Sequence, residues 1–131
     1  MATARPRPLS PHMSIWRWRV HMAVSIAHRV TGNGLAFAGI VASLWWLVAA
    51  ASGTEAYATF YGWATWGPAY VIWVGLTWAF FQHLGSGLRH LVMDTGAGFD
   101  IGTAKTTATA AFVFGIVGTA LVWAYIFFGR G

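Results

Sequence analysis

The residues of this chain that are best suited to chemistry lie between His83 and Asp94. On a helix, His83, Gly87 and His90 recur at intervals of four and three residues, and Asp94 follows four residues later, so all four share one face. A histidine inside an apolar, membrane-type helix indicates a functional site by default. Glycine on the same face leaves a gap through which a flat group such as a porphyrin can approach the backbone. The pattern therefore predicts a haem site with His83 as the candidate iron ligand.

His83 and His90 cannot both bind one iron. They are seven residues apart, about 10 Å along a helix, so only one of them can serve as an axial ligand. The other ligand is then expected from a histidine of a second membrane subunit. Taken alone, a histidine in a membrane helix more often forms hydrogen bonds in packing, so a haem-free anchor stays open as an alternative.

A second polar group lies near the start of the first apolar stretch. Ser25 and Arg29 are four residues apart on one helical face, and His28 lies about 100° around the helix from Arg29. A hydroxyl donor beside a permanently protonated guanidinium can bind a quinone carbonyl and stabilise negative charge as the quinone is reduced. The alternative is that Ser25 bonds back to its own helix and Arg29 extends to the membrane interface.

The depths of these groups predict how a haem would be oriented. Arg29 and Arg89 should lie at similar depths, because the first two apolar stretches run in opposite directions. His83 lies six residues further in than Arg89, about 9 Å at helical rise. A haem bound by His83 would then direct its propionates towards His28, Arg29 and Arg89, with His28 shallower than His83.

Composition places these groups in a membrane. Of the 131 residues, 57% are hydrophobic and only 8% are charged, too few charged residues for a soluble domain of this size. Residues 30–54, 56–88 and 106–129 carry no formal charge, and each stretch exceeds the roughly 20 residues that cross a bilayer as a helix. We expect an all-α integral membrane protein with three transmembrane helices, and glycines on the first and third of them suit close packing. The predicted parts of the single domain 1–131 are an N-terminal arm over 1–20 and helices over about 21–51, 61–93 and 105–128.

The charge distribution predicts the orientation. Seven of the eight basic residues precede the first apolar stretch or flank the second connection, whereas the first connection carries only Glu55 and Arg130 is a lone charge at the other side. By the positive-inside rule the N-terminus is cytoplasmic, and the bacterial cytoplasmic (inner) membrane is favoured over the mitochondrial one. The pI near 10.5 is explained by attraction to anionic headgroups rather than by nucleic acid. His12 and His21 are expected at the interface or a docking surface.

Three motifs occur in order along the chain, at residues 7–12, 25–32 and 83–94. In this order and spacing they closely resemble the cytochrome b subunits that, with a second small membrane subunit, anchor succinate dehydrogenase (respiratory complex II). The resemblance covers the arm and all three apolar stretches.

The resemblance implies a succinate:ubiquinone oxidoreductase in which this chain helps to bind haem b and ubiquinone. Ser25 and Arg29 match the family's quinone-site serine and arginine, and His83 matches its axial haem ligand. His28 and Arg29 match positions near the propionates, and His90 is a further candidate without an assigned role. Succinate oxidation would occur on a partner flavoprotein. Electrons would arrive from a partner iron–sulfur protein, since this chain contains no cysteine to hold such a cluster.

Other functions are weighed against this one. A cytochrome b anchor of a fumarate reductase would perform the same chemistry in reverse, and a b-type haem protein of another pathway would share the histidines. A transporter with a histidine proton relay ranks last, because no acidic residue lies within any predicted span.

Overall fold

The computed structural model describes residues 17–129, which are helical apart from short connections. Residues 1–16 of the predicted arm, which include His12 and the whole of the first motif, lie outside the described residues. The helices are α1 (Val20–Gly34), the π-helical turn η2 (Leu35–Gly39), α2 (Ile40–Ser52), α3 (Thr54–Ala64), α4 (Ala69–Asp94) and α5 (Ile101–Phe128). The all-helical prediction is confirmed.

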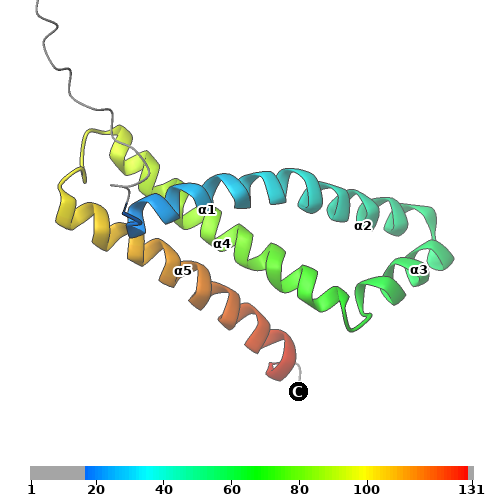
Figure 1. The fold of residues 1–131 in the computed structure, drawn as a ribbon. Coiled ribbons are helices and arrows are strands. Elements are labelled where there is room, and N and C mark those ends of the chain that lie inside the picture. Colours follow the sequence, from blue (N-terminus) through cyan, green and yellow to red (C-terminus); the bar gives the residue numbers. More distant parts are fainter. Residues whose placement is uncertain (1–16, 130–131) are drawn as a thin grey trace, which may run out of the picture.

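The first long helix is continuous from Val20 to Ser52, since α1, η2 and α2 follow one another without a break. The π-helical turn accommodates an extra residue and changes the facing of the side chains that follow it. The helix ends at Gly53, whose φ of 107° is a conformation that glycine adopts without steric cost. The chain reverses there into the short helix α3 (Figure 1).

The second predicted span differs from the structure at its start. Instead of one helix from about residue 61, α3 ends at Ala64 and α4 begins at Ala69. Pro68 explains the break, because its missing N–H suits the start of a helix but not its interior. The indole of Trp73 fixes the turn by donating a hydrogen bond to the carbonyl of Ala64 (2.8 Å).

The third helix begins earlier than the predicted residue 105. Asp100 caps α5, where its carboxylate accepts hydrogen bonds from the backbone N–H groups of Gly102 (3.0 Å) and Thr103 (3.2 Å). Asp100 is exposed, so its carboxylate caps the helix while it remains in contact with solvent. Its role is to set the first turn of α5.

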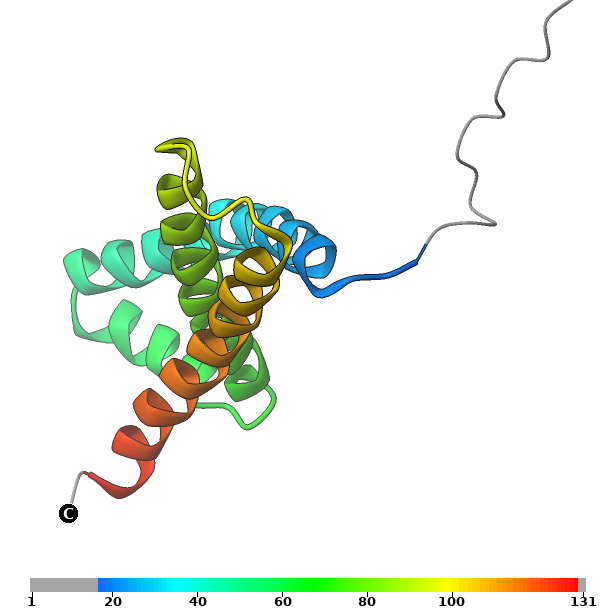
Figure 2. The ribbon, with the colours of Figure 1, turned by 90° about the vertical axis from the view of Figure 1, so that its left-hand side faces the viewer.

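Three helices converge at the end of the molecule where α1 begins (Figures 1 and 2). Val24 of α1 packs there against Ala108 and Ala111 of α5 in a small core. Farther along, α2 contacts α3 but neither α4 nor α5, so the first helix diverges from the pair formed by α4 and α5.

Glycines bring α4 and α5 close together, as expected for packing inside a membrane. A Cβ at Gly115 would lie 2.8 Å from Oε1 of Gln82, and one at Gly118 would lie 2.7 Å from the ring of Phe81. Neither position can carry a larger side chain unless its neighbour moves.

Two helical stretches, Val20–Ser52 and Ile101–Phe128, are long and apolar enough to cross a bilayer, with mean hydropathies of 1.9 and 2.1. Most of their large apolar side chains are exposed, for example Val41, Leu44 and Leu121. Helix α4 has sufficient length, but its second half contains polar side chains that lower its mean hydropathy. On composition alone, α4 is therefore not a candidate membrane span.

Candidate functional site

The centre of the candidate site is a cluster of three histidines between α1 and α4. The rings of His28 and His83 are stacked, with centroids 3.9 Å apart and planes inclined by 7°. The ring of His90, two helical turns beyond His83, lies 5.0 Å from that of His28. The structure therefore brings the two motifs around residues 25–32 and 83–94 together.

Two groups of α1 fix the ring of His83. Its Nδ1 donates a hydrogen bond to the carbonyl of His28 (3.0 Å) and lies 3.4 Å from the hydroxyl of Thr31. Thr31 is itself held by donating to the carbonyl of Ala27 (2.7 Å). Because a carbonyl can only accept, Nδ1 carries the proton, and the neutral ring keeps its lone pair on Nε2. This arrangement is common among metal-binding histidines, whose other nitrogen bonds a backbone carbonyl.

Gly32 allows this close approach. A Cβ at Gly32 would lie 2.7 Å from Cε1 of His83, a distance that real Cβ atoms essentially never show. Gly87, the glycine predicted to leave a gap, faces His28 instead, and a Cβ there would be 3.7 Å from its Cε1, an ordinary contact. From the sequence, Gly32 was predicted only as a packing glycine, and its contact with the ring of His83 was not predicted, although its position one turn after His28 was a usable signal.

The rings of His28 and His83 lie closer together than residue counting suggests. Their centroids are 3.9 Å apart, whereas counting separates the two residues by about 10 Å along the helices. Counting along two helices treats them as parallel rods, but α1 diverges from α4 beyond this contact.

His90 shares one feature with His83. Its Nδ1 donates to the carbonyl of Ser86, one turn earlier on the same helix (2.7 Å), so its Nε2 also keeps a lone pair. Hydrogen bonds with α1 distinguish the two histidines. In the part of the chain that the structure describes, His83 bonds to a second helix and His90 does not.

Ser25 and Arg29 lie one turn apart on α1, next to the histidine cluster. Ser25 is half-buried and Arg29 is exposed. Along the described helices many hydroxyls bond back to their own backbone, as that of Ser52 does to Val48 (2.7 Å). Between residues 17 and 129 the Ser25 hydroxyl has no such bond, so the back-bonded alternative is not observed. Both groups are available to a ligand.

Arg89 does not face the cluster, contrary to the prediction. It lies on the side of α4 that packs against α5, and its Nε donates to the hydroxyl of Thr107 (3.1 Å). The prediction used depth alone and ignored that Arg89 lies about 240° around the helix from His83.

Three buried side chains in or beside the cluster carry polar atoms without a partner among residues 17–129. They are Nδ1 of His28, the hydroxyl of Ser86 and the amide of Gln82. An unpaired buried polar atom is costly, so His28 Nδ1 fits a cluster that receives a further polar group such as a carboxylate. Gln82 and Ser86 are fully buried and were not singled out from the sequence.

The described residues hold no group of three or more side chains that could bind a bare metal ion. Haem iron has a weaker requirement, because the porphyrin supplies four ligands and each protein chain need supply only one. A histidine with a fixed tautomer and a glycine that admits close approach meet that requirement.

These features define a class: an all-helical membrane subunit with a histidine cluster between two of its helices. The family model for the succinate dehydrogenase/fumarate reductase transmembrane subunit matches residues 3–122. The chain belongs to this family, as the three motifs predicted, and is a subunit of an oxidoreductase complex.

Similar proteins agree with this assignment. The succinate dehydrogenase cytochrome b556 subunit of Paracoccus denitrificans is 39% identical over 93% of this chain and 92% of its own length. The cytochrome b556 subunit of Rickettsia felis is 36% identical over 89% and 90%, respectively. The mitochondrial cytochrome b560 subunit of Bos taurus is 35% identical over 88% of this chain and 69% of its own length.

Proposed function

We propose that this chain is the membrane-anchor subunit of a succinate:ubiquinone oxidoreductase, where it contributes one axial ligand to haem b and part of the quinone site. The observation that carries the proposal is the fixed ring of His83, whose Nδ1 is bonded to α1 and whose Nε2 is left with its lone pair. The bond from Nδ1 also serves helix packing, as a haem-free anchor would require, so it is the free lone pair on Nε2 that suits His83 to iron.

His83 would hold the haem iron, together with a residue of the partner membrane subunit. When bound, the haem accepts and returns one electron. Thr31 and the carbonyl of His28 orient the ligand, and Gly32 keeps the first helix close to it. The unpaired Nδ1 of His28 is suited to a propionate, with Arg29 close by in sequence to balance its charge. His90 borders the cluster as a further candidate.

Ser25 and Arg29 would form this chain's part of the quinone site. The hydroxyl, which has no partner between residues 17 and 129, can donate to a quinone carbonyl. The guanidinium stabilises the negative charge that develops there during reduction. Charge stabilisation at a developing oxyanion is commonly the largest contribution to such reactions.

The remaining features follow from this role. Helix α4 is the second of three spans, because its polar side chains line the bundle interior and need not meet lipid. The N-terminus is cytoplasmic in the bacterial inner membrane. A second small membrane subunit completes the haem site, and the iron–sulfur and flavoprotein subunits carry out succinate oxidation.

The quinone assignment is tested by separating two activities of the intact complex. Ser25→Ala removes one hydrogen bond, so succinate-driven ubiquinone reduction should fall by about tenfold, and Arg29→Gln should lower it at least as far. Electron transfer from succinate to a soluble acceptor should persist in both variants. Ser52→Ala is the matched control, because that hydroxyl only bonds its own helix. Equal loss of both activities would mean that Ser25 and Arg29 support assembly and not the quinone.

A further inference from the structure

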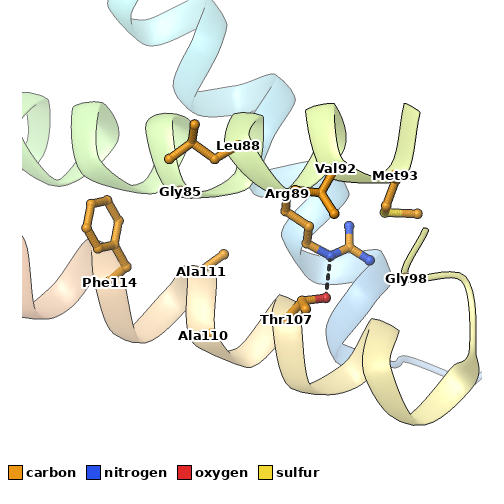
Figure 3. A pocket seen from close by; sticks show the side chains of 10 residues that line it. All are labelled: Gly85, Leu88, Arg89, Val92, Met93, Gly98, Thr107, Ala110, Ala111 and Phe114. Carbon is orange, nitrogen blue, oxygen red and sulfur yellow. Dashed lines mark hydrogen bonds between the residues drawn. The ribbon is translucent and has the colours of Figure 1, made fainter. Parts of the chain in front are cut away.

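A groove separate from the histidine cluster runs between α4 and α5. It has a volume of about 320 Å³ and is nearly all apolar. Figure 3 shows its lining, in which Phe114 of α5 points towards α4 and Arg89 of α4 reaches Thr107 of α5. The apolar lining includes Leu88, Val92, Ala110, Ala111 and Phe114.

The groove and the histidines occupy different faces of α4. Leu88 and Val92 lie about 140° and 180° around the helix from His83, so they face away from the contact with α1. No residue of α1 lines the groove. Whatever fills it is therefore distinct from the ligands of the histidine cluster.

One positive charge lies at the end of this apolar groove. The side chain of Arg89 extends along α4 towards the loop at Gly98 (Figure 3), and its Nε donates to the hydroxyl of Thr107 (3.1 Å). No carboxylate among residues 17–129 forms an ion pair with it. Thr107 thus holds the guanidinium in place while its remaining N–H groups stay available, and this fork matches the geometry of a phosphate.

We propose that the groove binds an anionic phospholipid, with its phosphate on Arg89 and an acyl chain along α5 as far as Phe114. Thr107 and Phe114 are seven residues apart, about 10 Å at helical rise, so the groove accommodates a length of chain rather than a compact ligand. The start of α1 lies at the same end of the helices and carries Arg17 and Arg19, a positive region that attracts anionic headgroups. An apolar lining with a single cation at one end has the polarity of such a lipid.

The test counts lipid on the intact complex. The complex is equilibrated with vesicles of phosphatidylcholine and phosphatidylglycerol in equal amounts, recovered in mild detergent, and its bound phosphatidylglycerol is quantified by mass spectrometry. Arg89→Gln should lose one bound phosphatidylglycerol per copy. Ala110→Phe, which fills the groove from an exposed position and leaves Arg89 intact, should lose it too. Lys105→Gln, a cation nearby but outside the groove, should keep the parental number.

Results of three kinds would overturn the proposal. The first is a parental complex without retained phosphatidylglycerol, or an Arg89→Gln variant that retains as much as Lys105→Gln. The second is release of the lipid by inorganic phosphate alone, which would indicate a simple anion site. The third is a photo-crosslinker at position 110 that captures a polypeptide of the complex, since a partner helix would then occupy the groove. Crosslinking to phospholipid supports the proposal.

Discussion

Replacing Gly32 by alanine should weaken haem binding, because the new methyl group would meet the ring of His83. The added Cβ would lie 2.7 Å from Cε1, whereas ordinary van der Waals contacts begin near 3.4 Å, so the ring or the helix must move by about 0.7 Å. Overpacking of this kind costs about 1–3 kcal/mol. If that cost falls on the haem-bound state, haem affinity drops by about 5- to 150-fold.

The assay measures haem per complex from the reduced pyridine haem spectrum, together with the rate at which the complex loses haem on warming. Gly34→Ala is the matched control, because it lies two residues further along the same helix and nothing lies within 4 Å of its added Cβ. We expect Gly34→Ala to retain haem as the parent does. Equal haem retention in Gly32→Ala and Gly34→Ala would refute the argument that Gly32 positions His83.

Two further predictions concern the helices that support the site. Gly118→Ala should lower the free energy of unfolding of the complex by about 1–3 kcal/mol and its melting temperature accordingly, since the added Cβ would lie 2.7 Å from the ring of Phe81. Gly62→Ala is the control and should leave the melting temperature unchanged, because nothing lies within 4 Å of its added Cβ. Asp100→Ala should speed amide hydrogen exchange at Gly102 and Thr103 by about fivefold, because losing a helix cap costs about 1 kcal/mol, while Asp100→Asn should have a smaller effect.

Each of these predictions has a contradicting outcome. If Gly118→Ala and Gly62→Ala have the same melting temperature, α4 and α5 do not pack through Gly118 as described. If exchange at the first turn of α5 is unchanged in Asp100→Ala, the carboxylate does not cap that helix.

Much of the fold could be predicted because apolar length and charge are local properties of the sequence. The three uncharged stretches correspond to helices, and the glycines expected to pack, such as Gly115, do so. Gly67 and Pro68 signal the break before α4. The break was not predicted, because apolar residues on both sides of this pair gave the second stretch the composition of one continuous span. The cap at Asp100 could have been predicted from the sequence, because an aspartate directly before a helical segment is a typical N-cap.

The site was harder to predict because its geometry depends on how two helices meet. The residue types at His83 and His28 identified the cluster, but their stacking follows from the contact of α1 with α4 and from the divergence of the first helix beyond it. Likewise, residue counting from the membrane surface predicts similar depths for Arg29 and Arg89, but it ignores that Arg89 lies on the face of α4 that packs against α5. Such relations between helices are tertiary properties.

The most direct test of the account is the dithionite-reduced minus oxidised absorption spectrum of the purified complex, recorded for the parent, His83→Ala and His21→Ala. His21 is a histidine of α1 outside the cluster, so it controls for the loss of a histidine in general. The account predicts a b-type signal in the parent and in His21→Ala, and none in His83→Ala although the complex remains assembled. A signal that persists in His83→Ala, or no signal in an assembled parental complex, would contradict the assignment of His83 as a haem ligand.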